Sequence, residues 1–462
     1  MSPLSETRTW LQENLPLLIA EFGIPAASVG VLSGGEVVTA SAGVLNLGTG
    51  VEADDDSVFQ IGSITKVWTA TLVMQLVDEG LLDLDVPVRT YLPDFVLADD
   101  DAAAAITARQ LLSHVAGFEG DIFTDTGLGD DAVGKYLAVL SDVPQLFAPG
   151  ERFSYNNAGY VTLGRLVEVL RGKTWEAALR DHLVAPLGLT HVATNAAEAI
   201  LFRAALGHIP SPEGQGVVPA PIWNLARSNA PAGSMLAMTA RDLLGFAQLH
   251  ISGGTAPDGT RLLSAESAAA MRTPHVDVPI PALMGDSWGL GWELFDWDGG
   301  AVIGHDGGTV GQNAFLRVVP EAGVAVALLT NGGGTIGLYA ELFTRLLHDL
   351  AGVTAPALPV PSADAPPVDL DRVLGTYSSS VSDSTVRVDD EGRIWLDRVM
   401  KGVFATLGPA PDPVELVGWR EDRLLPKEPS NGVHMVHAFV GDDGQGRALY
   451  LHTGRADRRT GA

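Results

Sequence analysis

The sequence predicts an α+β fold in which helices cover one antiparallel sheet, followed by a β-rich domain. Apolar runs typical of strands lie at residues 27–32, 36–42 and 302–330, near both ends of a long first segment. Between them, the chain from Ser63 to about His250 has mostly helical patterns. Strands that return to one sheet after a helical insertion are typical of this fold class.

A proline-rich stretch divides the chain into two domains. Five prolines lie between residues 351 and 369, a composition typical of an extended linker. At 462 residues the chain is also long enough for two domains. We therefore expect a first domain at residues 1–352, a linker at 353–369 and a second domain at 370–462.

The elements of the first domain follow in order. A helix over residues 5–22 precedes two strands joined by the turn Ser33-Gly34-Gly35. Residues 64–77, after Ser63, are apolar on nearly every face and predict a helix that is buried on most sides. Further helices are expected at residues 108–114, 160–170, 175–183, 240–249 and 339–350, and a strand hairpin at 314–319 and 324–329.

The second domain shows short strand-like runs separated by glycine turns. Asp390-Glu391-Gly392 and Asp442-Asp443-Gly444 are the expected hairpin turns. Because residues 370–462 are few for a closed barrel, we expect a domain that is β-rich. Its strands are expected at residues 373–380, 385–388, 393–396, 433–440 and 447–452.

Composition excludes several classes of protein. Hydrophobic residues make up 46% of the chain and charged residues 18%, which supports a substantial core and excludes wholesale disorder. No apolar run reaches the ~18 residues that a membrane-spanning helix needs. The first ten residues lack the basic-then-apolar layout of a signal peptide, and the chain has no cysteine, so we expect a cytoplasmic protein.

The net charge is strongly negative. The chain has 29 Lys plus Arg against 56 Asp plus Glu, a formal net charge of −27. Phosphates would be repelled, so neither nucleic acid nor an anionic membrane is an expected partner. The acidic runs at residues 52–56 and 99–101 lack the spacing of a calcium site. We expect no metal and no cofactor.

Ser63 and Lys66 form the most informative motif. Their spacing places both side chains on one helix face, one turn apart. A serine hydroxyl is a poor nucleophile until a base takes its proton. A lysine in apolar surroundings can be that base, because desolvation lowers the pKa of its amine. The helix N-terminus also favours the negative charge that develops near Ser63.

The alternative for Lys66 is a surface lysine that snorkels from the helix edge. The chain has five lysines against 24 arginines, and Lys66 alone follows a serine by three residues. A lysine inside an apolar helix is costly unless it is paired or functional, which favours the catalytic interpretation.

Two further motifs follow in the chain. Tyr155-Asn156-Asn157 is the only Tyr-x-Asn and comes after the turn Pro149-Gly150-Glu151. His305-Asp306-Gly307-Gly308 follows an apolar run and precedes the expected hairpin. Taken singly, Tyr155 could be a packed aromatic, Asn157 a turn residue and His305 a strand histidine.

In the order Ser-x-x-Lys, Tyr-x-Asn, His-x-Gly, these motifs resemble those of the penicillin-recognising serine enzymes. That superfamily includes serine β-lactamases, DD-peptidases, D-aminopeptidases and related esterases. The resemblance covers residues 5–350, and the segments at residues 106–114 and 288–292 are also similar to sequences of that superfamily. It implies a serine β-lactamase-like domain whose active site lies between the sheet edge and a helical subdomain. The second domain resembles the lipocalin-like β domain of some D-aminopeptidase relatives.

The resemblance implies roles for the motif residues. Ser63 would attack an acyl carbonyl, and Lys66 and Tyr155 would share its proton, in an order that is left open. The backbone N–H groups of Ser63 and Gly308 would form the oxyanion hole. His305 would tune the Tyr155 proton or a substrate carboxyl group.

Other residues are expected to contact the substrate. The amide of Asn157 would bind a substrate amide, and Trp223 would line an apolar peptide pocket, with core packing as its alternative. An arginine of the last hairpin, Arg447 or Arg455, would grip a substrate carboxylate or carbonyl, with a solvated surface position as its alternative. The predicted substrate-binding residues are Asn157, Asp306, Gly307, Trp223 and Arg447.

Two nearby patterns receive no catalytic role. His452-Thr453-Gly454 also fits His-x-Gly, but it lies beyond the linker, so His452 is expected to be an ordinary strand-end histidine. Residues 231–234 predict a turn that borders the site.

The position where β-lactamases usually carry lysine is His305, which argues against penicillin hydrolysis as the main activity. With the absence of an export signal and the β-rich second domain, this chain resembles the penicillin-binding-protein-type thioesterases. The likeness implies that a peptidyl thioester, delivered by a peptidyl carrier protein, is transferred to Ser63. The peptide would leave by head-to-tail macrocyclisation at a D-configured C-terminal residue, with the second domain as a lid that orders the amine.

Other functions share this chemistry. The first alternative is a cytosolic D-aminopeptidase or D-stereospecific amide hydrolase, and the next is a carboxylesterase. A ligand-binding module derived from the fold would be expected to have lost the nucleophile or the base, whereas Ser63 and Lys66 are both present. No oligomeric state is predicted.

Overall fold

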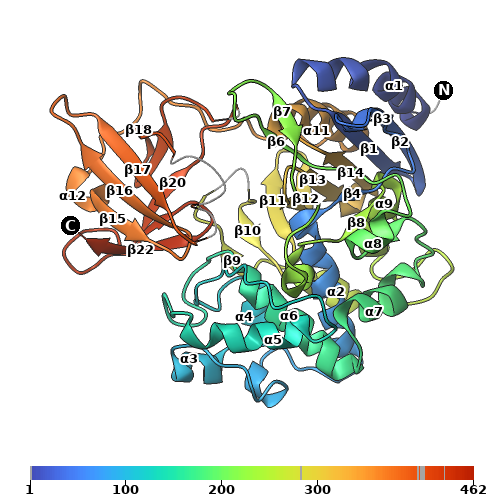
Figure 1. Cartoon of the computed structure of the whole chain (residues 1–462), viewed down its shortest axis with the longest axis horizontal. Coiled ribbons are helices and arrows are strands. Elements are labelled where there is room, and N and C mark those ends of the chain that lie inside the picture. The colour runs from blue at the N-terminus through green and yellow to red at the C-terminus, as the bar shows by residue number, and fades with distance from the viewer. Residues whose placement is uncertain (1–2, 281–283, 403–404, 406–410, 431, 462) are drawn as a thin grey trace.

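The computed structural model describes residues 3–280, 284–402, 405, 411–430 and 432–461. The outer ends of the two predicted domains, residues 1–2 and 462, lie outside this set. A large domain of helices and sheet is followed by a closed barrel, orange to red in Figure 1, which confirms the predicted fold class. None of the helices in the described part has both the length and the apolar character that a bilayer crossing requires.

The large domain is built on one sheet with the strand order β3-β2-β1-β14-β13-β12-β11-β10-β9. β1 (Ala26–Ser33) pairs antiparallel with β14 (Val324–Thr330), so strands from the two ends of the domain meet inside the sheet, as predicted. The other strands are β2 (Glu36–Asn46), β3 (Val51–Glu52), β9 (Val276–Asp277), β10 (Ser287–Trp288), β11 (Glu293–Trp297), β12 (Gly300–Gly308) and β13 (Asn313–Val319).

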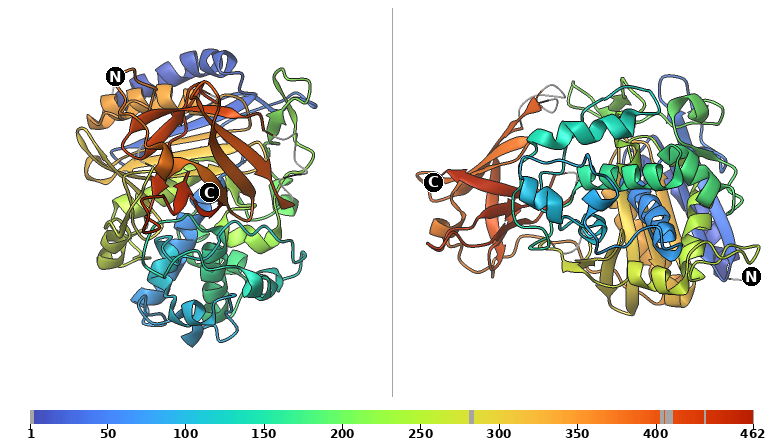
Figure 2. Two further views of the ribbon diagram at one scale, coloured as in Figure 1. Left: turned by 90° about the vertical axis from the view of Figure 1, so that its left-hand side faces the viewer. Right: turned by 90° about the horizontal axis from the view of Figure 1, so that it is seen from below.

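Helices cover both faces of this sheet. α1 (Pro3–Glu21) and α11 (Thr335–Ala351) bury their apolar residues in one cluster with the strands. α2 (Thr65–Asp78) and α9 (Ala240–Ile251) join a second cluster on the opposite face. Figure 2 shows the helical region, cyan to green, on the side of the sheet away from α1. α2 is therefore surrounded by protein, as its uniformly apolar sequence predicts.

The helical region places the tyrosine motif at the start of a long helix. The Asn156 side chain accepts a hydrogen bond from the Gly159 N–H at 2.7 Å, which caps α6 (Asn157–Arg171). Tyr155 therefore lies in extended chain just before that helix. The other helices of this domain are α3 (Asp100–Ala105), α4 (Ala108–Leu112), α5 (Ala132–Val139), α7 (Trp175–Leu179), α8 (Ala196–Ala199) and α10 (Ala265–Met271), and its remaining strands are β4 (Phe59–Gln60), β5 (Val192–Ala193), β6 (His208–Pro210), β7 (Val217–Pro219) and β8 (Ala237–Met238).

The second domain closes into a barrel, which confirms the predicted β-rich, lipocalin-like domain. It begins with α12 (Leu370–Val373), and Tyr377, Leu396 and Phe439 are buried in its core. Its strands are β15 (Gly375–Ser378), β16 (Ser382–Val388), β17 (Ile394–Met400), β18 (Val414–Arg420), β19 (Arg423–Pro426), β20 (His437–Val440), β21 (Tyr450–His452) and β22 (Ala456–Gly461). β18, β19 and β22 were not among the predicted strands.

The barrel packs on the large domain through apolar side chains. Phe153 and Trp288 of the large domain share one buried cluster with Leu425 and Val436 of the barrel. At the edge of this contact, the Tyr450 hydroxyl donates to the Leu146 carbonyl at 2.7 Å. The two domains are thus joined by a continuous core next to the tyrosine motif.

The packing of α11 makes a stability prediction. Leu342→Ala should lower the free energy of unfolding by about 2–5 kcal/mol, because the fully buried side chain leaves a cavity against the sheet. Urea unfolding followed by circular dichroism measures this change in the free energy of unfolding. The exposed neighbour is the control: Glu341→Ala should change the free energy by less than about 0.5 kcal/mol. Equal losses for both variants would contradict this packing.

Candidate active site

Ser63 lies in a tight turn directly before α2. The 3-10 turn Gly62–Ile64 continues into the helix, so Lys66 lies in its first turn. Lys66 Nζ is 3.1 Å from Ser63 Oγ and 2.6 Å from the Ala232 carbonyl oxygen. The structure thus brings the predicted pair into hydrogen-bond contact.

The surroundings of Lys66 favour its uncharged form. Its side chain is completely buried, and this burial lowers the pKa well below the ordinary 10.5. The positive charge of Arg455 lowers the pKa further, and the negative charge of Asp121 opposes both effects. An amine in this position can accept a proton from Ser63.

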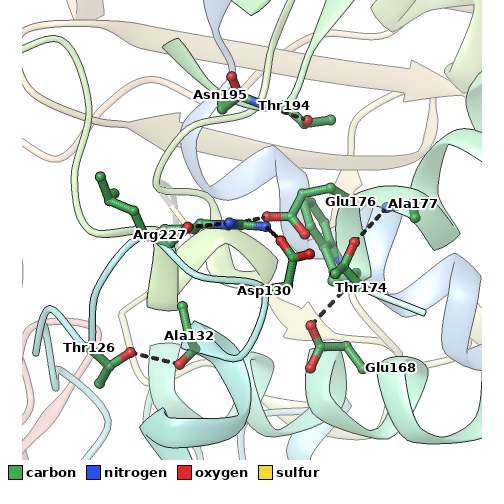
Figure 3. Close-up of polar contacts among 12 residues, drawn as sticks. Thr126, Asp130, Ala132, Glu168, Thr174, Glu176, Ala177, Thr194, Asn195 and Arg227 are labelled. Carbon is green, nitrogen blue, oxygen red and sulfur yellow. Dashed lines mark hydrogen bonds and ion pairs between the residues drawn. The ribbon is translucent and has the colours of Figure 1, made fainter. Parts of the chain in front are cut away.

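The carbonyl that accepts from Lys66 belongs to the turn that the sequence analysis left without a chemical role. The 3-10 turn Arg227–Ala232 is fixed by Arg227, which donates to Glu176 at 3.0 Å and to Asp130 at 2.9 Å (Figure 3). A backbone acceptor can be supplied by any residue type, so no sequence signal marks Ala232.

Tyr155 contacts both Ser63 and Lys66. Burial raises the pKa of its phenol, while the hydrogen bond to Ser63 lowers that pKa. The Lys66 nitrogen is 4.8 Å from the centre of the tyrosine ring. The hydroxyls of Ser63 and Tyr155 and the amine of Lys66 therefore form one connected group.

Glycines let the end of β12 approach the Ser63 turn. A Cβ on Gly307 would lie 1.9 Å from the Ile61 carbonyl oxygen, and a Cβ on Gly62 would lie 2.5 Å from the Gly308 nitrogen. Gly62 also has a positive φ of 50°, which favours glycine. The backbone of Gly308 consequently lies beside that of Ser63, at the edge of the same cavity.

His305 faces this group as a neutral ring. Its Nδ1 is 2.6 Å from the Asp306 carbonyl oxygen, an acceptor, so Nδ1 carries the proton. The side chain is buried, which lowers its pKa to about 3. The ring centre lies 6.3 Å from that of Tyr155 and 5.4 Å from that of Trp288.

Asp306 is held by a buried arginine. Arg317 donates to the two oxygens of Asp306 at 2.6 and 3.0 Å, and Glu293 lies 3.8 Å from both Arg317 and His305. Burial raises the pKa of Glu293, and the charge of Asp306 raises it further. Neither Glu293 nor Arg317 was among the residues predicted for the site. An arginine within the apolar run at residues 314–319 was the available signal.

Asn157 is linked to the barrel through Asp121. The Asn157 amide nitrogen donates to one Asp121 oxygen at 2.6 Å, and Arg455 Nε donates to the other at 2.9 Å. The Arg455 guanidinium also lies 4.6 Å from the Tyr155 ring centre. Asp121 is a further residue that the sequence analysis missed, because no motif surrounds it.

Two of the predicted substrate-binding residues lie elsewhere. Trp223 donates through its indole N–H to the Ala205 carbonyl at 2.9 Å, and Arg447 pairs with Asp443 at 2.7 Å. Among the described residues that line the cavity, Asp306 and Gly307 are present, whereas Trp223, Arg447 and Asn157 are not. The barrel arginine that reaches the site is Arg455, from the turn after β21.

The site opens into a cavity of about 570 Å³ between strands β11 to β13, the start of α11 and the barrel, rather than at an edge strand of the sheet. Its walls combine the candidate catalytic side chains with apolar groups and with residues of the barrel. They include Ser63, Tyr155, Glu293, His305, Asp306, Gly307, Gly308, Phe315, Ile336, Tyr339, Met284, Met435 and Arg455.

Several known proteins resemble this chain in sequence and fold. Residues 12–351 match the β-lactamase family model. The chain is 46% identical over 368 residues to penicillin-binding protein 4 of Amycolatopsis lactamdurans, covering 79% of this chain and 96% of that protein.

Solved structures extend the likeness to the barrel. SurE matches with a TM-score of 0.79 and 29% identity, over 99% of this chain and 100% of SurE. SurE with D-Leu matches over the same shares, with 29% identity and a TM-score of 0.77. The octameric penicillin-binding protein homologue from Pyrococcus abyssi matches with a TM-score of 0.65 and 25% identity, over 94% of this chain and 96% of that one.

The close approach of β12 to the Ser63 turn makes a prediction. Gly307→Ala should slow the reaction of Ser63 with a fluorophosphonate by roughly a hundredfold, because the added methyl group separates the strand from the turn. Intact-mass spectrometry measures the labelling rate. Gly134→Ala in α5 is the matched control: the nearest atom to its added carbon belongs to the flexible Arg165 side chain, at 3.2 Å. A normal rate for Gly307→Ala would show that the approach is not required.

Proposed function

This chain belongs to the β-lactamase family, and we propose that it is a stand-alone thioesterase that releases nonribosomal peptides by head-to-tail macrocyclisation. The observation that carries the proposal is the Ser63–Lys66–Tyr155 group, which opens into a cavity that the barrel borders with Arg455. The likeness to SurE covers both domains, so the barrel is part of the architecture that the two proteins share. That SurE has been solved with D-Leu supports a D-configured residue at the cleaved end of the peptide.

Acylation begins at Ser63. Its oxygen attacks the thioester carbonyl while its proton passes to the Lys66–Tyr155 pair. The negative oxygen of the tetrahedral intermediate accepts hydrogen bonds from the N–H groups of Ser63 and Gly308. The carbon–sulfur bond then breaks, and the thiol leaves with the proton that Ser63 released.

Cyclisation reverses this proton path. The amine at the other end of the peptide attacks the Ser63 ester and forms the new amide bond. The amine proton passes through the Lys66–Tyr155 pair to Ser63 Oγ as the ester bond breaks. His305 is uncharged and its ring lies beside that of Tyr155. It tunes the acidity of the Tyr155 hydroxyl without adding a positive charge to the site.

The fate of the acyl-enzyme depends on whether water or the amine reaches the ester carbon. The barrel borders the cavity, and its apolar contact with Phe153 and Trp288 keeps water from that side. The Asn157 amide nitrogen is engaged by Asp121, so a substrate N–H would have to reach the amide oxygen of this buried residue. Arg455 presents a positive charge for a substrate carbonyl or carboxylate.

The proposal includes the setting of the reaction. A peptidyl carrier protein delivers the thioester in the cytoplasm, and the absence of cysteine suits that compartment. Nucleic acid and membranes are not partners, consistent with a net charge of −27.

The direct test uses a linear hexapeptide thioester that ends in a D-residue. The enzyme should convert it to a cyclic product, which mass spectrometry identifies by the loss of the thiol without the gain of water. Ser63→Ala should form none, because the acyl-enzyme cannot form. Linear acid alone, or activity on D-amino-acid amides without thioester turnover, would assign the protein to the D-stereospecific hydrolases instead.

The buried base makes a prediction about pH. The rate of Ser63 acylation by p-nitrophenyl acetate should fall as acidification protonates Lys66, with a midpoint well below 10.5. His305 should add no step between about pH 5 and 9, because its pKa of about 3 leaves it neutral throughout. Stopped-flow measurements across this range test both statements. A step near pH 6.5 that disappears in His305→Gln would contradict the neutral histidine.

A further inference from the structure

The second His-x-Gly of the chain lies against the tyrosine motif. His452 ends β21 and is completely buried. Its Nδ1 accepts the Gly454 N–H at 3.2 Å, so the ring proton is on Nε2, which lies 3.0 Å from the Phe153 carbonyl oxygen and donates to it. Burial lowers the pKa of His452 to about 4, which keeps this arrangement at neutral pH.

Backbone hydrogen bonds extend this contact along the motif. The Tyr155 N–H donates to the Gly454 carbonyl at 2.9 Å, and the Ala456 N–H donates to Ser154 Oγ at 3.1 Å. Hydrogen bonds from the β21–β22 turn therefore reach Phe153, Ser154 and Tyr155 in succession.

His114 of the large domain holds the same segment from the other side. Its carbonyl accepts the Ser154 N–H at 2.9 Å, and its Nδ1 accepts the Asn156 N–H at 2.9 Å. Its ring lies 4.3 Å from that of Tyr155. The large domain thus fixes the amides on both flanks of Tyr155, whereas the amide of Tyr155 itself is fixed by the barrel.

We propose that His452 is a positioning residue for Tyr155, through which the barrel sets the geometry of serine activation. His452 orders the turn by accepting a hydrogen bond from the Gly454 N–H. The Gly454 carbonyl is thereby held where it accepts a hydrogen bond from the Tyr155 N–H. The inference rests on the role of Tyr155 in proton transfer given under the proposed function. It extends that function, because the barrel acts on the first chemical step for a substrate of any size.

A mobile lid and a positioning element differ in what they affect. A lid orders a long peptide and leaves the reaction of a small reagent unchanged. A positioning element changes the reaction of Ser63 with any electrophile, because a displacement of about 1 Å in a catalytic group can cost roughly a hundredfold in rate. The shared core of Phe153, Tyr155, Leu425 and Val436 favours the second behaviour, since a lid that opened would expose it.

The experiment compares His452→Leu with His452→Gln in the full chain, using a small fluorophosphonate as the probe. Ser63 Oγ bonds to phosphorus as fluoride leaves, and the serine proton passes to the Lys66–Tyr155 pair. Intact-mass spectrometry gives the labelled fraction, which counts folded sites, and the rate constant for those sites. Glutamine can donate to Phe153 and accept from Gly454, whereas leucine can do neither.

His452→Leu should lower the rate constant per labelled site by about ten- to a hundredfold. His452→Gln should stay within about threefold of the natural chain. Leu396→Ala, in the barrel core, is the control for general destabilisation: it should lower the unfolding temperature and leave the rate per labelled site unchanged. A His452→Leu rate within threefold of the natural chain, or an equal loss in Leu396→Ala, overturns the inference.

Tyr155→Phe, measured in parallel, separates this inference from the proposed function. If Tyr155→Phe is slow and His452→Leu is normal, the positioning role fails and the proton role of Tyr155 stands. If Tyr155→Phe reacts at the natural rate, the proton role fails, and the positioning role falls with it.

Discussion

The burial of the Lys66 amine is the feature on which the rest of the site depends, because an ammonium ion is costly to bury in an apolar helix. Lys66 lies between Ser63 Oγ and the Ala232 carbonyl with no exposure to solvent. The apolar residues on all faces of α2 place this helix inside the protein, and the same burial lowers the pKa of Lys66. Folding and activation of the serine rest on the same burial.

The barrel reaches this lysine by electrostatics as well as by packing. Arg455 of the barrel lowers the Lys66 pKa, and Asp121 of the helical region raises it. The two residues form an ion pair across the domain contact at 2.9 Å. Asp121 also accepts a hydrogen bond from the Asn157 amide. Docking of the barrel therefore fixes the charge near Lys66 and the orientation of Asn157 through the same carboxylate.

Much of the fold could be predicted because buried elements carry a pattern. The strand at residues 27–32 and the hairpin at 314–329 are apolar runs, and they form adjacent strands of the sheet. β22 carries no such pattern, since Asp457, Arg458 and Arg459 interrupt it. It is a strand because its backbone pairs with β15 and β21 as the barrel closes, and pairing of that kind leaves no mark in the local sequence.

The sequence by itself determined the order of the main elements of the large domain and the candidate residues Ser63, Lys66, Tyr155 and His305, because residue type and spacing decide what chemistry a side chain can perform. Only the tertiary structure decided their partners. In the folded chain, the Ala232 carbonyl accepts a hydrogen bond from Lys66. Arg455 lies at the cavity and pairs with Asp121, whereas Arg447 pairs with Asp443. A backbone acceptor has no residue identity, and contacts across a domain boundary depend on how the two cores join.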